Sequence, residues 1–352
     1  LNVGESVAAP IEQEMNGVDN MIYMKSTNAN DGSMVVQVSF DVGTDPDMNT
    51  VLAQNRVSAS TAKLPSSVTQ YGVTTKKSLP NILMLVTLTT DNPAHNTAEF
   101  LGNYGLINIK DRLARVPGIG RVDVMGASNY SMRIWIKPDL LAIRGITVPE
   151  IVKAVNEQNI IVPGGKFGAE PAPPGTEFTY TVRLPERFNS AEAFEDIVIR
   201  TLPDGSQVKI GDVARVALGT ETYSMIPRLG INLEGREKTS KPGAIVALYQ
   251  APGSNAVELA ENIKMEIEDL SKSFPDGMTY DVSLDSTLPI TAGIKDIIVT
   301  LIVALILVVL VVFIFIQDWR ATLIPTLAIP VSLIGAFMFF PMLGFTINVL
   351  SL

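Results

Sequence analysis

Residues 297–316 read IIVTLIVALILVVLVVFIFI, a stretch of twenty residues without one charged side chain. A helix rises about 1.5 Å per residue, so a helix of this length extends about 30 Å, the thickness of the hydrocarbon layer of a bilayer. Lys295 and Asp296 lie just before it. The stretch therefore predicts a membrane-spanning helix at about residues 293–316.

A second apolar run, from about residue 321 to 343, follows the short polar turn Gln317-Asp318-Trp319-Arg320. Its three prolines disfavour a soluble helix, but neighbouring membrane helices can satisfy the freed carbonyl groups. A buried hairpin in a large soluble core is the alternative, although helices of this length without a polar face are rare in soluble proteins. We expect a second spanning helix at about residues 322–343. The charges of the turn leave the orientation in the membrane open.

Neither apolar run contains Asp, Glu, Lys or His. Ionisable side chains within the membrane are the usual carriers of protons and ions. The sequence therefore shows no proton relay in this part of the protein.

Residues 1–288 have the mixed charges and the many Gly and Pro residues of a soluble region. The whole chain of 352 residues has a net charge of −9, and this acidic balance argues against a nucleic-acid partner. Cysteine is absent, which excludes disulfides, thiolate metal sites and cysteine nucleophiles. The one histidine, His95, lies in a predicted loop, where we interpret it as solvated.

Strands and helices alternate along this soluble region, and Thr147 with Glu150 has capping-box spacing at a helix start. The turn Asp204-Gly205 predicts a hairpin. The pattern favours α+β sandwiches with helices on one face of each sheet. The expected strands are 34–40, 80–89, a pair formed by 121–124 and 132–136, 176–184, 196–201, 206–218, 244–249 and 280–284, and the expected helices are 45–64, 97–115, 147–158 and 254–272.

Motifs of catalysis are absent or incomplete. Gly118-Ile119-Gly120 lacks the third glycine of a dinucleotide fingerprint, and Gly164-Gly165-Lys166 lacks the spacing of a P-loop. We expect neither an enzyme nor a cofactor. The neighbouring residues Met15, Met21 and Met24 could bind a soft metal, but thioethers more often fill a core.

Several stretches resemble, in order and spacing, the resistance–nodulation–division (RND) family of efflux transporters, and the resemblance covers essentially the whole chain. It is nearest to the branch that exports hydrophobic and amphiphilic drugs. The sequence begins with neither Met nor a signal peptide and stops without a polar tail, so we expect it to be roughly the first third of a longer protein. The stretches are IEQEMNGVDNM (11–21), FDVGTD (40–45), PGIG (117–120), MRIW (132–135), DVARV (212–216), RATLIPT (320–326) and GFTIN (344–348).

The resemblance implies a division of the chain into a periplasmic porter, an inserted docking subdomain and a membrane region. The first porter subdomain would be residues 1–79, without its initial strand. The second would be split between 80–130 and 220–288. The docking subdomain would be 131–219, with the Gly- and Pro-rich stretch 164–175 as an arm that reaches the next subunit. The membrane region would be 289–352.

The resemblance also implies how such a protein works. RND pumps are homotrimers of the bacterial inner membrane, in contact with lipid. They act with a periplasmic adaptor and an outer-membrane channel and are driven by protons. The family's relay uses paired aspartates on the fourth helix and a lysine on a later helix. By this resemblance the turn from Asp318 to Arg320 is cytoplasmic.

The drug pocket of the family implies six substrate-contacting positions here. Relatives often have Phe where this chain has Ile82 and Met125, so stacking with flat aromatic drugs is expected to be weaker. Aliphatic and thioether walls still suit varied apolar ligands. The six residues are Ile82, Leu85, Met125, Tyr223, Met225 and Leu284.

Three functions are compatible with these patterns. Drug–proton antiport by the complete protein is the leading hypothesis. Metal efflux by another branch of the same superfamily would require methionines or acids that converge in the cleft. A membrane-anchored periplasmic scaffold without transport is the third possibility.

Overall fold

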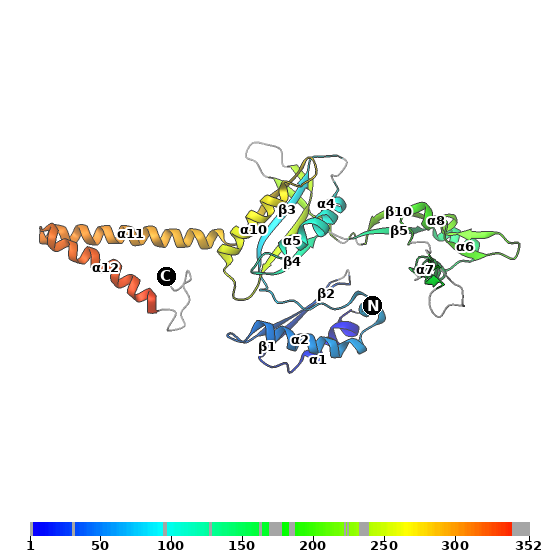
Figure 1. Cartoon of the computed structure of the whole chain (residues 1–352), viewed down its shortest axis with the longest axis horizontal. Coiled ribbons are helices and arrows are strands. Elements are labelled where there is room, and N and C mark those ends of the chain that lie inside the picture. The colour runs from blue at the N-terminus through cyan, green and yellow to red at the C-terminus, as the bar shows by residue number, and fades with distance from the viewer. Residues whose placement is uncertain are drawn as a thin grey trace.

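The computed structural model describes residues 3–29, 32–93, 97–126, 129–161, 164–168, 178–182, 187–221, 223, 225–231 and 239–339. Its described part is a mixed α/β structure with three bodies and two long apolar helices. The helices project from one end, and one of the bodies lies at the opposite end (Figure 1). His95 and most of the expected arm, residues 169–175, lie outside the described residues.

The N-terminal body pairs a two-stranded sheet with helices. Its elements are η1 (Gly4–Ala8), α1 (Ala9–Met15), β1 (Met21–Asn28), β2 (Met34–Phe40), α2 (Pro46–Ser60), η2 (Thr61–Lys63) and α3 (Ser66–Tyr71). The sheet is an antiparallel pair of β1 and β2. Asp45 begins α2 by accepting a hydrogen bond from Asp47 N at 2.8 Å, with Pro46 in the first turn. Ala53 and Val57 of α2 are buried against Met15 and Val18.

The sheet body is a four-stranded antiparallel sheet in the order β14-β3-β13-β4. Its helices pack on one face, because the buried apolar residues of α10 and of the α4–α5 segment belong to the same core as the sheet. Asn255 begins α10 by accepting a hydrogen bond from Val257 N at 3.0 Å. The elements are β3 (Ile82–Thr90), α4 (Ala98–Tyr104), η3 (Gly105–Ile109), α5 (Lys110–Leu113), β4 (Ile119–Met125), β13 (Ala244–Gln250), α10 (Ala256–Ser271) and β14 (Met278–Asp285).

The distal body lies between β4 and the short hairpin of β11 (Arg228–Ile231) and β12 (Thr239–Pro242), which precedes β13. Its core of buried residues includes Ile151, Phe194, Ile197, Ile210 and Val213. The elements are β5 (Tyr130–Ile136), α6 (Pro138–Arg144), α7 (Val148–Gln158), β6 (Lys166–Phe167), β7 (Tyr180–Thr181), α8 (Ala191–Glu195), β8 (Val198–Thr201), β9 (Gln207–Lys209), α9 (Ile210–Val213) and β10 (Ala214–Thr220).

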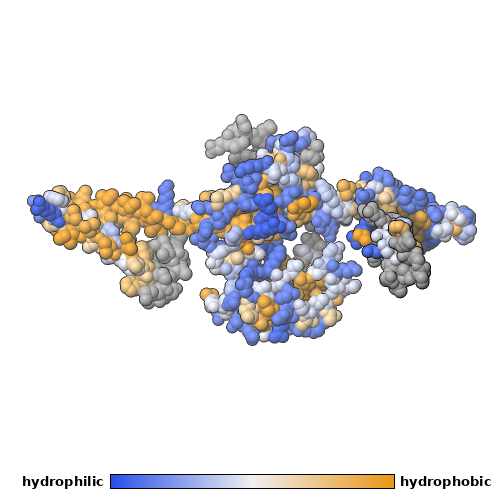
Figure 2. Space-filling view, in the orientation of Figure 1, coloured by the Kyte–Doolittle hydropathy of each residue, from blue (hydrophilic) through white to orange (hydrophobic). Residues whose placement is uncertain are grey.

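Helices α11 (Leu288–Ile316) and α12 (Trp319–Phe339) are both long and apolar enough to cross a membrane. No residue of α11 is buried. Figure 2 shows the apolar colouring that covers both helices. Among the described residues nothing covers this apolar surface, so it fits a pair of membrane helices better than the alternative of a hairpin inside a soluble core. Helix α12 begins at Trp319, three residues before the expected start at about residue 322. Asp318 caps it by accepting a hydrogen bond from Arg320 N at 2.9 Å. Residues 340–343 of the expected helix lie outside the described part.

Residues 121–124 and 132–136 are strands as expected, but the expected pairing of the two with each other is wrong. Strand β4 pairs with β13, and β5 pairs with the returning strand β10. The chain leaves the sheet at Gly126, whose φ of 74° turns it toward the distal body. Strands β4 and β5 are thus neighbours in sequence but belong to different sheets, because each pairs with a strand far along the chain.

The expected strand 206–218 is also wrong as one element. It is divided into β9, the short helix α9 and β10. Asp212 accepts a hydrogen bond from Lys209 N at 2.9 Å and closes a helical turn within the run. The hairpin turn at Asp204-Gly205 is confirmed, with Gly205 at φ 83°. Of the expected strand 176–184, only Tyr180–Thr181 is a strand among its described residues.

The expected capping box at the start of α7 is confirmed. Glu150 Oε2 accepts hydrogen bonds from Thr147 N at 2.7 Å and from Thr147 Oγ1 at 2.9 Å, and Arg200 pairs with Oε1. The backbone hydrogen bond from Thr147, the Arg200 side chain and the Thr147 hydroxyl together lower the pKa of Glu150 from 4.5 to about 2. The ionised carboxylate thus holds α7 to β8.

Acid is expected to loosen α7 through Glu150. Because its pKa is depressed in the folded state, its stabilising contribution is complete above about pH 4.5 and is lost as the pH falls through about 2. The protection factors of the α7 amides, which compare exchange with the intrinsic rate at the same pH, should therefore fall over this range, and Glu150→Gln should lower them already at pH 7. The control is Glu157→Gln, which removes only the exposed ion pair with Lys153 at 3.8 Å. Equal protection in both variants would contradict this role of Glu150.

Candidate functional site

Within the described residues, helices cover one face of the sheet body and not the other. Met84, Val86 and Leu88 of β3 are fully buried in the core with α10. Side chains alternate between the two faces of a strand, so Leu85 and Thr87 lie on the opposite face. We call this opposite side the helix-free face of the sheet.

Four of the six residues expected to contact drug lie on this face. Strand pairing aligns Leu85 with Ala247 of β13 on one side and with Leu284 of β14 on the other. Directly paired residues of antiparallel strands share a face. The same pairing aligns Met125 with Ile245 and Ile82 with Tyr249, so the structure brings Ile82, Leu85, Met125 and Leu284 together on the helix-free face.

A β-bulge decides the position of Leu284. The register of β14 shifts between Val282, which packs on the helix side, and Leu284. Without this shift Leu284 would share the face of Val282, because side chains alternate with a period of two. Ser283 Oγ and Thr87 Oγ1 lie 2.6 Å apart in a hydrogen bond that anchors the bulge. The bulge leaves Leu284 43% exposed on the helix-free face.

Tyr223 and Met225 lie outside the four strands of the sheet. The ring of Tyr223 lies on the β5–β10 ribbon, with its centroid 5.0 Å from the guanidinium carbon of Arg133. Met225 is 56% exposed and lies two residues before Pro227. A Cβ at Gly126 would overlap the Pro227 ring, so this connecting segment passes the end of β4 beside Met125. The contact of all six residues with substrate stays a prediction.

Polar residues on the same face were missed by sequence reasoning. The guanidinium carbon of Arg121 lies 3.9 Å from the ring centroid of Tyr249, and Arg121 Nε lies 2.9 Å from Asp123 Oδ2. Pairing places Asp123 in one row with Ala247 and Leu85. The alternation in Arg-Val-Asp-Val-Met, with Val122 buried, is the signal that could have revealed them. The face is therefore amphiphilic rather than uniformly apolar.

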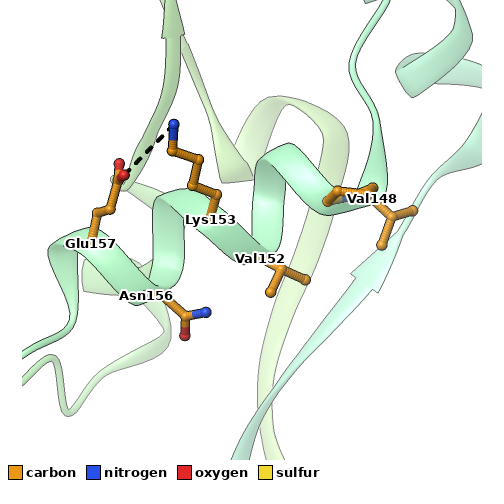
Figure 3. A pocket seen from close by; sticks show the side chains of 6 residues that line it. Val148, Val152, Lys153, Asn156 and Glu157 are labelled. Carbon is orange, nitrogen blue, oxygen red and sulfur yellow. Dashed lines mark ion pairs between the residues drawn. The ribbon is translucent and has the colours of Figure 1, made fainter. Parts of the chain in front are cut away.

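None of the six expected residues lines either of two surface pockets. One, of ≈ 640 Å³, lies along the exposed side of α7, where Val148, Val152 and Asn156 follow one another at a spacing of one turn (Figure 3). The other, of ≈ 490 Å³, lies between the N-terminal body and the sheet body. Its lining residues are Asp47, Thr50, Val51, Thr75, Lys76, Lys77, Lys110, Asp111, Ala114, Ile119, Gly120, Arg121 and Val122.

The clustered methionines belong to a core. Met15 is buried, and Met21 and Met24 pack against the same cluster as Ala53 and Val57 of the N-terminal body. Within the described residues, no group of three or more His, Cys, Asp or Glu side chains is arranged to hold a metal ion. The thioethers are thus committed to packing, which disfavours the metal-efflux hypothesis.

The model of the AcrB/AcrD/AcrF family matches residues 1–352. The chain belongs to this family. The resemblance to RND efflux transporters is thereby confirmed. Among its relatives, multidrug export protein AcrF of Escherichia coli (strain K12) is 37% identical over 99% of this chain and 33% of its own length. Toluene efflux pump membrane transporter TtgB of Pseudomonas putida is 37% identical over 99% and 32%. Multidrug resistance protein MdtF of Escherichia coli (strain K12) is 36% identical over 99% and 33%.

This chain therefore spans about a third of the length of the curated AcrB/AcrD/AcrF relatives that it matches. The match is continuous from the N-terminal body through both apolar helices. The relatives are named as transporters, which fits the expectation that this chain does not belong to an enzyme.

Proposed function

We propose that the protein containing this chain exports apolar and amphiphilic compounds across the cell envelope. The observation that carries the proposal is the match of the family model to all 352 residues, together with relatives that are named as multidrug and toluene efflux transporters. The helix-free face supports it with a surface that is both apolar and polar. Substrate would lie against Ile82, Leu85, Met125 and Leu284, with Tyr223 and Met225 at the edge.

Protons are the proposed energy source. Between Ile297 and Phe339, the only charged residues are Asp318 and Arg320, which lie at the turn between the helices. Neither is placed inside an apolar segment, where a relay would act. We therefore assign the proton-carrying groups to parts of the protein outside residues 1–352.

The proposed location is the bacterial inner membrane, with several membrane passes. Helix α11 has 29 residues, so it extends about 44 Å, more than the hydrocarbon thickness of about 30 Å. Its first turns, which include Lys295 and Asp296, would lie at the periplasmic surface below the sheet body. The turn at Asp318 would then be cytoplasmic, and lipid would contact the apolar surface.

The proposed assembly is a homotrimer with a periplasmic adaptor and an outer-membrane channel. In this proposal the N-terminal body and the sheet body form the porter, and the distal body docks on neighbouring subunits. The large exposed apolar residues of the distal body, such as Ile161, Phe167 and Tyr180, support a role in contact with other chains.

Transport by the complete protein tests the proposal. In proteoliposomes with full-length protein, an apolar dye is expected to be expelled only when a proton gradient is imposed, and a protonophore should abolish export. Vesicles without protein and vesicles with a denatured sample are the controls. Export that ignores the gradient would contradict proton coupling, and a complete absence of export would favour a scaffold.

A further inference from the structure

The junction between the sheet body and α11 contains a buried carboxylate that the preceding sections do not use. Asp285 ends β14, and its side chain is 3% exposed. Its Oδ1 accepts hydrogen bonds from Thr287 N at 2.9 Å and from Thr287 Oγ1 at 2.6 Å. Thr287 is the residue that directly precedes α11. The carboxylate therefore holds the first residues of the membrane helix.

The other carboxylate oxygen binds a different element. Lys264 Nζ of α10 lies 2.6 Å from Asp285 Oδ2 as an ion pair, while no described group reaches Oδ2 with the angles of a regular hydrogen bond. A buried carboxylate is costly without a partner charge, so Oδ2 depends on Lys264. Burial raises the pKa of Asp285, but Lys264 and the two donors of Thr287 outweigh burial and lower it. The carboxyl group is thus ionised at neutral pH.

A third contact fixes the same junction to the centre of the sheet. Ser286 donates hydrogen bonds from N at 3.0 Å and from Oγ at 2.8 Å to the carbonyl oxygen of Leu83 in β3. Figure 1 shows α11 leaving the sheet body beside α10. Three consecutive residues therefore tie α11, α10 and β3 together. We call Lys264, Asp285, Ser286 and Thr287 the junction cluster.

The junction cluster lies next in sequence to two of the residues that are proposed to contact substrate. Leu284 directly precedes Asp285, and Ile82 directly precedes Leu83. Both residues lie on the helix-free face that is proposed to contact substrate. A displacement of α11 would therefore reach this face through buried hydrogen bonds and an ion pair rather than through a flexible loop.

We propose that the junction cluster is a rigid joint that transmits movement of α11 to strands β3 and β14 and so to the substrate-contacting face. Lys264 and Asp285 act as positioning residues, since both lie on the helix side of the sheet and not on the proposed substrate-contacting face. This inference rests on the proposed function, because it concerns the coupling of membrane movement to export.

The first test separates coupling from stability in the full-length protein. Lys264→Met and Asp285→Asn each leave one partner uncompensated, whereas the double variant leaves no buried unpaired charge and should recover thermal stability. If the junction cluster is a rigid joint, the maximal export rate of the double variant should be lower than that of wild type by a factor of about five or more, a typical size for lost coupling. Its Kd for the substrate should be unchanged. Recovery of both stability and export in the double variant would overturn the proposal.

A matched control exists on the same helix. Glu266 of α10 pairs with Arg112 of α5 at 2.8 Å, and both residues belong to the sheet body. Glu266→Gln should leave the export rate and Kd near wild-type values, and Lys264→Arg should retain most of the rate because it keeps the charge. A loss of export in Glu266→Gln equal to that in the double variant would contradict a role specific to the junction.

A second readout does not depend on transport. This chain contains no cysteine, so spin labels can be introduced at Glu261→Cys on α10 and Lys295→Cys on α11, in a full-length background freed of other cysteines. The distance distribution should be narrow in wild type and in Glu266→Gln and broad in the double variant. Unchanged distributions would overturn the rigid joint. If the wild-type protein showed a narrow distance distribution but no export, the proposed function would be refuted and the rigid joint would not.

Discussion

Ile263→Asp is expected to abolish the folded sheet body. Ile263 lies on α10 and is fully buried among the residues that join α10 to β3 and β13. Loss of a large aliphatic side chain alone costs about 2–5 kcal/mol, and an unpaired buried carboxylate adds several more. This sum is comparable to the whole stability of a typical domain, about 5–15 kcal/mol. The measurement is the amount of protease-resistant full-length protein recovered in membranes.

Met265→Asp is the matched control for this prediction. Met265 lies two residues further along the same helix and is 61% exposed. An aspartate there meets water, so recovery near that of wild type is expected. If Ile263→Asp and Met265→Asp gave equal amounts of resistant protein, the packing of α10 on the sheet described above would be wrong.

Ile82→Phe combined with Met125→Phe is expected to strengthen the binding of flat aromatic substrates. Both residues lie on the helix-free face, and a well-placed aromatic pair contributes about 0.5–1.5 kcal/mol beyond its area. Two added rings should therefore lower the Kd for a planar aromatic dye by about tenfold, since about 1.4 kcal/mol corresponds to a factor of ten. The Kd for a purely aliphatic amphiphile should change much less. Fluorescence polarisation on the purified full-length protein measures both.

Met265→Phe serves as the control here as well. It adds an aromatic ring to the same body but on an exposed position of α10, which covers the opposite face of the sheet. It should leave both dissociation constants unchanged. An unchanged Kd for the dye in the double variant, or an equal change in Met265→Phe, would remove Ile82 and Met125 from the substrate site.

Much of the secondary structure followed from local patterns. Residues 34–40, 244–249 and 280–284 are strands as expected, and the expected helix 254–272 is observed as Ala256–Ser271. These elements were predictable because apolar periodicity and capping side chains act within a few residues. The strand β1 was missed, since its burial does not alternate.

The candidate site was harder to predict from the sequence than the secondary structure. The resemblance to a family indicated six residues, yet no local pattern indicated that four of them share the helix-free face. Register across four strands and the bulge before Leu284 decide this. Both features depend on partners far apart in the chain, which a local pattern does not specify.

The sequence by itself determined that two long apolar segments follow a region of mixed helices and strands, because a run of twenty residues without a charge is long enough for a spanning helix and lacks the polar face of a soluble one. Its motifs also determined the family. Only the tertiary structure decided that β4 pairs with β13 and β5 with β10, and that Asp285 lies between α10 and α11. The physical reason is range: apolar content and helix caps act locally, whereas strand partners and buried ion pairs are selected by the packing of the whole body.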